Sequence, residues 1–168
     1  PLYIADGHHR FETASAFAVE SRGADRLLAF IVSARDPGLI VLPTHRIVFG
    51  AGRSPGRLLP LWRERFLVDA LAPEGDPVAR LQTVPQDRTA CVVLGPGGQE
   101  FLLTLKADAD LAPLAATEPN ATVRALDISR IEHFVVREIV GAGESTVTLD
   151  YSADPAKATG IARSGRSA

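Results

Sequence analysis

The sequence predicts an α+β protein, a mixed α/β arrangement in which helices flank a mixed sheet. Two observations support this fold class. Short apolar runs of strand length alternate with segments whose apolar residues recur at helical spacing. Glycine and proline clusters separate these segments, as they do at turns. Because 168 residues with 46% apolar content can bury a sizeable core, we expect a single α/β region over residues 1–168.

The first part of this region, residues 1–50, is expected to form a strand–helix–strand unit. Residues 2–5 are an apolar run of strand length, and residues 11–23 carry apolar side chains at helical spacing. Two more strand-like runs follow at 26–34 and 39–49, separated by an Asp-Pro-Gly turn signal. A short polar segment, DGHHR, therefore lies between the first predicted strand and the predicted helix.

The second part, residues 51–168, is expected to form an extension that contains a hairpin and a helix near the C-terminal end. A helix is predicted over 57–66 and a shorter one over 76–82. The runs 89–95 and 100–107 flank the sequence GPGGQ, whose glycines permit the positive φ angles of a tight connection. This is the best hairpin signal in the chain.

The strongest amphipathic helix is predicted over residues 126–141, with Gly141 ending it. One stripe of branched apolar side chains runs along this segment: Ile128, Ile131, Val135 and Ile139. Because such a stripe is typical of a core-facing helix, we expect a structural role for it. A strand over 145–152 and a short helix over 153–165 complete the chain, while residues 111–125 carry no clear periodicity.

Composition argues against several functional classes. The formal net charge is -2 and the 18 basic residues are dispersed, so nucleic acid is not an expected partner. No run approaches the roughly 20 apolar residues that span a bilayer, and no signal peptide is recognisable, so we expect no membrane and a cytoplasmic location. The single Cys91 excludes an internal disulfide, and its apolar neighbours predict a buried, unreactive thiol.

The sequence contains no methionine and begins with Pro1 directly before a strand-like run. These two features predict that the chain is a fragment of a longer one. The remainder of its own full-length chain is then an expected partner. An active site built from several segments would be incomplete in such a fragment.

The DGHHR segment has the chemistry of a phosphate-holding corner. The start of a helix offers unsatisfied backbone N–H groups and the positive end of the helix dipole. Gly7 lets the backbone approach a phosphate, Arg10 offers a bidentate fork, and His8 and His9 donate from ring nitrogens. Asp6 would repel the anion, which indicates a bound metal ion or a hydroxyl that Asp6 orients for attack.

A purely structural interpretation of this corner stands beside the functional one. Asp6 can serve as a helix cap and Gly7 as a simple turn, with His8 and His9 as exposed first-turn residues. A metal site built on the two histidines is disfavoured, because neighbouring helical residues do not face each other and no HExxH pattern accompanies them.

Four stretches of the sequence resemble the DUF1015 family of uncharacterised bacterial and archaeal proteins. They are YIADGHHRFETA, GLIVLPTHRIV, LDISRIEHFVVREIVG and VTLDYS, in this order. The resemblance extends from Leu2 to about Gly165. Because members of this family have further portions before and after these stretches, the resemblance also implies that the chain is a fragment, truncated at both ends.

The Asp-Gly-x-His-Arg pattern between a strand and a helix is similar, more distantly, to the signature of the ParB/sulfiredoxin-like superfamily, which includes free-serine kinases. This similarity implies that Gly7, His9 and Arg10 bind nucleotide phosphates, with His8 beside them. It implies that Asp6 orients a hydroxyl or a magnesium ion. The acidic residue that the serine kinases contribute upstream of this corner has no counterpart among the residues before Asp6.

A second polar group follows Pro43, in a stretch that the small domains of that superfamily lack. Because the proline ends a strand-like run, Thr44, His45 and Arg46 are expected to form a second polar wall facing the substrate. An exposed strand end with a surface histidine and arginine is an equal alternative.

The function predicted from these features is binding of nucleotide phosphate, with transfer of a phosphoryl group to a small hydroxylated metabolite. The resemblance implies ATP or ADP and magnesium as cofactors. Two alternatives remain open: a nucleotide-binding regulatory or interaction module without catalysis, and a metal-dependent hydrolase.

Overall fold

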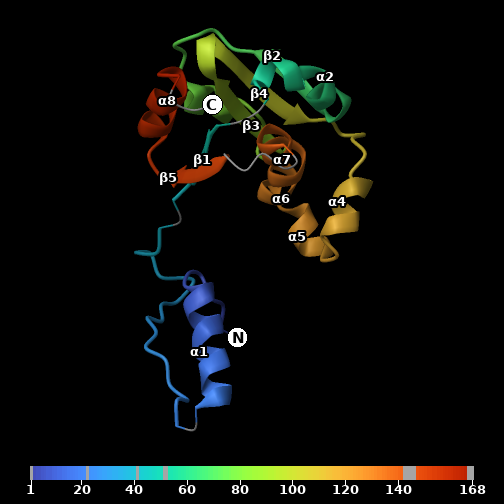
Figure 1. Ribbon diagram of the computed structural model, residues 1–168. Coiled ribbons are helices and arrows are strands. Elements are labelled where there is room, and N and C mark those ends of the chain that lie inside the picture. Colours follow the sequence, from blue (N-terminus) through green and yellow to red (C-terminus); the bar gives the residue numbers. More distant parts are fainter. Residues whose placement is uncertain (1, 22, 41, 51–52, 142–146, 166–168) are drawn as a thin grey trace. The chain divides into compact units, whose positions relative to one another are not determined.

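The computed structural model describes residues 2–21, 23–40, 42–50, 53–141 and 147–165 (Figure 1). The chain divides into two compact units, Pro1–Val41 and Leu42–Ala168. The combination of helices and strands confirms the predicted α+β class. None of the helices in the described ranges is long and apolar enough to cross a membrane.

The described residues of the first unit form one helix, α1 (His8–Glu20), with segments outside regular secondary structure before and after it. The helix begins three residues earlier than predicted, so both histidines lie in its first turn. The strands predicted over 2–5 and 26–34 are wrong, because neither range forms a strand. A strand needs a neighbour for its backbone N–H and C=O groups, and no described residue pairs with either run.

The strands of the second unit form two small antiparallel sheets in place of the expected mixed sheet. A three-stranded sheet has the order β2 (Phe66–Ala70), β4 (Gln99–Leu105), β3 (Ala90–Gly95). A two-stranded sheet pairs β1 (His45–Phe49) with β5 (Thr148–Ser152). The run predicted over 39–49 therefore yields a strand only in its second half, after the proline.

The predicted hairpin is confirmed. Strands β3 and β4 are joined by a short 3-10 turn, η1 (Pro96–Gly98), in which Gly97 and Gly98 have φ angles of 69° and 74°. Only glycine adopts this left-handed region at little cost, so the two glycines explain why the chain reverses here.

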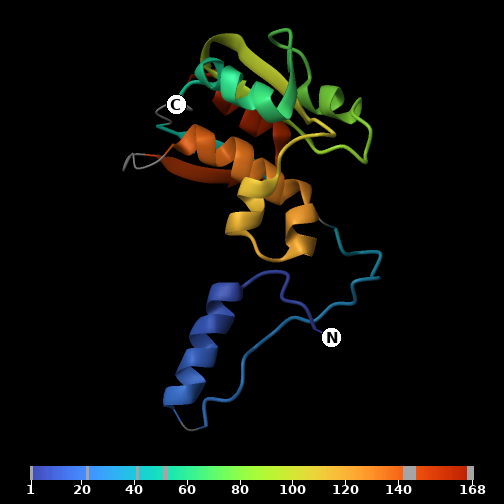
Figure 2. The ribbon, with the colours of Figure 1, turned by 90° about the vertical axis from the view of Figure 1, so that its right-hand side faces the viewer.

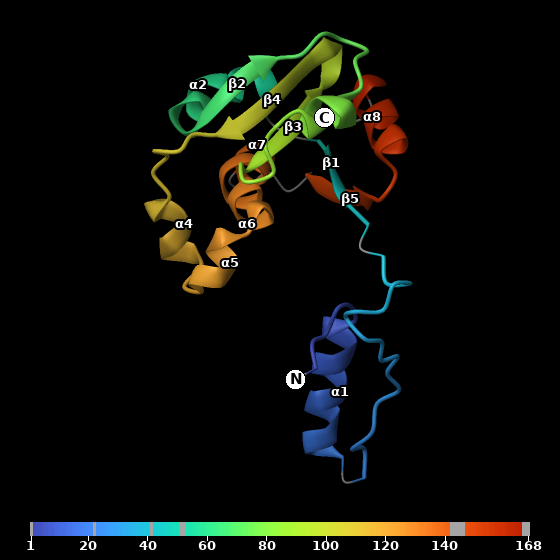
Figure 3. The same cartoon turned by 180° about the vertical axis from the view of Figure 1, so that it is seen from behind.

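Helices surround the two sheets (Figures 1 and 2). In chain order they are α2 (Pro55–Arg65), α3 (Pro77–Gln82), α4 (Ala112–Thr117), α5 (Ala121–Ala125), a continuous run of α6 (Asp127–Ile131), the π-helical η2 (Glu132–Val136) and α7 (Arg137–Val140), and α8 (Pro155–Arg163). The helices predicted over 57–66, 76–82, 126–141 and 153–165 are confirmed, and α4 and α5 occupy the range without a prediction. Helix α8 contacts β1, β3 and β5, and lies beside the two-stranded sheet in Figure 3.

The core lies between α2, the three-stranded sheet and η2. Its largest fully buried side chains are Trp62, Phe66, Leu103 and Val135. The adjacent residues Leu102 and Leu103 of β4 are 3% and 0% exposed. Because successive strand residues point to opposite faces, both faces of β4 are covered.

The continuous helix over α6, η2 and α7 has three consecutive buried residues at its centre, Phe134, Val135 and Val136. Gly141, with φ 72°, ends the helix as predicted. The stripe of branched residues is unevenly buried: Val135 is 2% exposed and Ile128 is 44% exposed. Only the middle of this helix is therefore enclosed.

Candidate functional site

The DGHHR corner of the first unit is built around a left-handed glycine. Gly7 has φ 83° and ψ 25° and is the N-cap residue of α1. Its carbonyl oxygen accepts the hydrogen bond from the Phe11 N–H at 3.0 Å. No side chain caps the helix, and its first turn contains no acidic residue. The interpretation of Asp6 as a helix cap is therefore wrong, and the positive end of the dipole lacks a side-chain counter-charge in this turn.

The arginine of the corner lies over this glycine. Nη2 of Arg10 is 3.7 Å from Oδ2 of Asp6, and a Cβ atom added to Gly7 would lie 3.2 Å from the same nitrogen. The structure thus brings Asp6, Gly7 and Arg10 together. His9 turns toward Glu12, with 3.6 Å between Nδ1 and Oε2, and His8 is exposed.

The corner has the groups that a phosphate requires. An anion there would meet the first-turn N–H groups and the guanidinium, which has five N–H donors and has one nitrogen, Nη2, 3.7 Å from Asp6. The side chains of Asp6 and Arg10 are 95% and 80% exposed, so both are accessible to a ligand. A magnesium ion held by one protein carboxylate and phosphate oxygens fits this composition, with Asp6 as the carboxylate.

The second predicted group, Thr44, His45 and Arg46, belongs to the other unit and to the start of β1. Thr44 is exposed, whereas His45 and Arg46 are half-buried. Nε of Arg46 donates to Oε2 of Glu132 at 2.9 Å, and its guanidinium lies 5.8 Å from the ring centre of Tyr151. Arg46 is therefore held from two sides by its own unit.

All three of these residues line a cavity of about 380 Å³ inside the second unit. Most of its wall is aliphatic. The wall includes residues 90–96 around β3, together with parts of β1, of α8 and of the continuous helix formed by α6, η2 and α7, which we call the long helix. The sequence identified Thr44, His45 and Arg46 but not this cavity. Its aliphatic residues occur in the same strand and helix patterns as core residues, so no sequence signal separates them.

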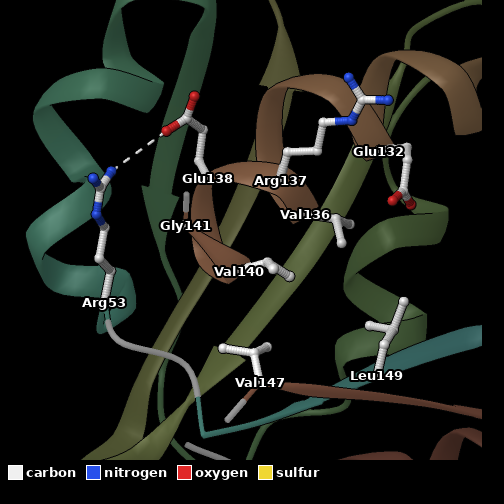
Figure 4. Close-up of a pocket in the computed structure, with 9 residues that line it drawn as sticks. All are labelled: Arg53, Glu132, Val136, Arg137, Glu138, Val140, Gly141, Val147 and Leu149. Carbon is white, nitrogen blue, oxygen red and sulfur yellow. Dashed lines mark ion pairs between the residues drawn. The ribbon is translucent and has the colours of Figure 1, made fainter. Parts of the chain in front are cut away.

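A second hollow, of about 520 Å³, lies beside α7 (Figure 4). Across it, Nη1 of Arg53 is 3.5 Å from Oε2 of Glu138, as the dashed line in Figure 4 marks. Arg137 has its own neighbour, since its Nη1 is 3.4 Å from Nδ1 of His133. Glu132, which also lines the hollow, accepts the hydrogen bond from Arg46. Each charged side chain of this hollow thus has a polar neighbour, and together they do not indicate a particular chemistry.

Two side chains of the second unit have shifted pKa values. Cys91 was expected to be buried and is half-buried, at the wall of the apolar cavity. Burial of its thiol raises the pKa from 9.0 to about 12. Burial, and then the cations of Arg137 and Arg65, lower the pKa of His133, which favours its neutral form. Among the residues that the structure describes, no three His, Cys, Asp or Glu side chains form a group suited to a metal ion.

Comparison with known proteins identifies a family for this chain. A family model described as a protein of unknown function, DUF1015, matches residues 1–129. No curated protein and no solved structure matches the chain. The more distant similarity to the ParB/sulfiredoxin-like superfamily thus stays a prediction. The match covers more than half of the chain and includes the first two of the four stretches, whereas the last two lie largely or wholly beyond residue 129. The chain therefore belongs to the DUF1015 family, as the resemblance predicted.

Proposed function

We propose that the corner formed by Asp6, Gly7 and Arg10 binds the phosphate of a nucleotide such as ATP or ADP. The observation that supports this most is that α1 begins at a left-handed glycine without a capping side chain, and with Arg10 beside that glycine. Backbone N–H groups, the helix dipole and a bidentate cation are the usual means of holding a phosphate. His8 and His9 add ring donors in the same turn.

We further propose that the full-length protein transfers the phosphoryl group to the hydroxyl of a small metabolite. Phosphoryl transfer needs mainly positioning and charge neutralisation from a protein. Arg10 and the first turn of α1 supply the neutralisation, and magnesium would add positive charge when bound. Asp6 lies next to Arg10 and is the one carboxylate of the DGHHR segment, so it is the group that would accept a hydrogen bond from the attacking hydroxyl.

Nucleotide affinity tests the binding role of Arg10 in the full-length protein. Arg10→Lys keeps the positive charge but removes the guanidinium that can form two parallel hydrogen bonds with a phosphate. The affinity for ATP, measured by isothermal titration calorimetry, should therefore fall about tenfold, which corresponds to ~1.4 kcal/mol. Arg26→Lys is the matched control, because Arg26 belongs to the same unit and its side chain is 95% exposed. Equal affinity of both variants would refute the bidentate role of Arg10.

Turnover tests the role of Asp6. Asp6→Asn should reduce the rate of nucleotide consumption with a panel of hydroxylated metabolites by roughly a hundred- to ten-thousandfold, with little change in nucleotide affinity. If the unmutated protein binds nucleotide but consumes none with any metabolite, the chain is a nucleotide-binding module. That outcome would remove the kinase proposal and keep the phosphate site.

A further inference from the structure

The cavity of the second unit has the size and lining of a small-molecule site. Its volume of about 380 Å³ lies within the range of ligand pockets. Aliphatic and proline side chains form most of the wall, which is drawn from β1, β3, α3, the long helix and α8. Among the described residues, no Asp or Glu lines it. The lining therefore favours an apolar ligand and gives no support for binding a cation.

The positive charges at this cavity are already neutralised. Its lining includes two charged side chains, Arg46 and Arg53. Arg46 pairs with Glu132 at 2.9 Å, and Arg53 pairs with Glu138 at 3.5 Å. An anionic ligand would have to compete with these carboxylates for either guanidinium. The charge balance thus favours a neutral ligand.

One polar atom at the cavity lacks a partner. Nε2 of His45 is buried and has no hydrogen-bond partner among the described residues, although His45 lines the cavity. A buried polar atom left unpaired is unfavourable, so native structures rarely leave one without a reason. Because less than 1 Å² of this atom is accessible, a ligand in the cavity would reach the ring nitrogen only once the imidazole turns toward it, and one hydrogen-bonding group on the ligand would then satisfy it.

Polar contacts between side chains connect the secondary-structure elements that form the wall of the cavity. Arg46 and Glu132 join β1 to the long helix. Nη1 of Arg130 donates to Oγ1 of Thr89 at 2.7 Å, which joins the same helix to the start of β3. These contacts hold the two sides of the cavity in place without a ligand, and a preformed site loses little affinity to ordering.

We propose that this cavity binds a small, neutral, mainly apolar molecule whose one polar group forms a hydrogen bond with Nε2 of His45. Every residue of the site lies in the unit Leu42–Ala168. The proposal therefore does not depend on phosphate binding at the DGHHR corner. Its experiment uses no nucleotide, so the two proposals fail independently.

The test uses N-phenyl-1-naphthylamine, a neutral fluorescent probe with one N–H donor, and the full-length protein. Titration should give saturable binding with one probe per chain. The sulfonated analogue, 1-anilinonaphthalene-8-sulfonate, should bind at least about tenfold more weakly, because its charge finds no free cation. Absence of saturable binding by the neutral probe, or equal or tighter binding of the sulfonate, would overturn the proposal.

Matched substitutions on α8 locate the probe. Ala158 lines the cavity, whereas Ala156 is exposed on the same helix and does not line it. Ala158→Leu should weaken binding of the neutral probe by about tenfold or more, and Ala156→Leu should leave it unchanged. Equal affinities would mean that the probe binds elsewhere, for example at exposed apolar side chains, and would overturn the proposal.

The hydrogen bond has its own variant and an independent readout. His45→Phe keeps an aromatic ring without a ring nitrogen, so the neutral probe should bind about two- to tenfold more weakly. If either cavity variant does not fold, nuclear Overhauser contacts decide in the unmutated protein. The probe should contact the side chains of Cys91 and Ile131, which both line the cavity, and absence of these contacts would overturn the proposal.

Discussion

Replacement of Leu103 by alanine should strongly destabilise the second unit. Leu103 lies in the central strand β4 and is 0% exposed within the core that contains Trp62 and Phe66. The substitution removes three carbon atoms, which at ~0.8 kcal/mol for each buried CH₂ costs about 2.4 kcal/mol. The unfilled space adds to this cost, so the free energy of unfolding should fall by about 3–5 kcal/mol.

Leu67→Ala is the matched control, because it is the same substitution on the neighbouring strand β2. Leu67 is 54% exposed, so about half of the transfer term applies and water can occupy the space, giving a loss of about 1 kcal/mol. Urea unfolding followed by tryptophan fluorescence measures both variants. Trp62 is the single tryptophan of the chain and is 1% exposed, so the signal reports the second unit alone. Equal losses in the two variants would refute the assigned burial of β4.

Three further predictions concern polar and titratable side chains. Asp76 caps α3 through two backbone N–H groups, so Asp76→Ala should cost about 0.5–2 kcal/mol in urea unfolding, and an unchanged midpoint would contradict the cap. Glu100 is 3% exposed and accepts two hydrogen bonds from Arg163, so Glu100→Gln should cost roughly 1.5–3 kcal/mol while Glu64→Gln on the surface should be nearly neutral. Burial raises the pKa of Cys91 from 9.0 to about 12, so the unfolded chain loses this proton first, and stability should decline as pH rises across that interval. The decline should be smaller in Cys91→Ala, and equal pH profiles would contradict the pKa assignment.

Elements whose signals are local could be predicted from the sequence. The GPGGQ connection requires positive φ angles that glycine adopts freely, and the structure has a tight turn at this place. In the segment 126–141, apolar residues recur at helical spacing over most of its length, and a glycine ends it. Both boundaries of the observed helix agree with the prediction to within a residue. These elements form because short-range preferences and tertiary packing agree.

Elements that depend on a distant partner could not be predicted in the same way. The run 26–34 has the composition of a buried strand, yet Leu28 and Phe30 are 99% and 93% exposed because no described strand pairs with it. The same contrast between local and long-range signals holds for the DGHHR corner and the apolar cavity. The glycine turn and its arginine follow from five adjacent residues, whereas the apolar cavity is assembled from segments more than one hundred residues apart, such as His45 and Ala158.

The three buried residues of η2 place this π-helical turn between the hydrophobic core and the two hollows of the second unit. Phe134 belongs to the core and lines neither hollow, whereas Val136 lines both hollows and lies outside the core cluster. Val135, between them, belongs to the core and lines the apolar cavity. Mutational effects on folding and on cavity binding are therefore separable at Phe134 and Val136. The two effects are inseparable at Val135, where loss of a methyl group would both leave a space in the core and enlarge the apolar cavity.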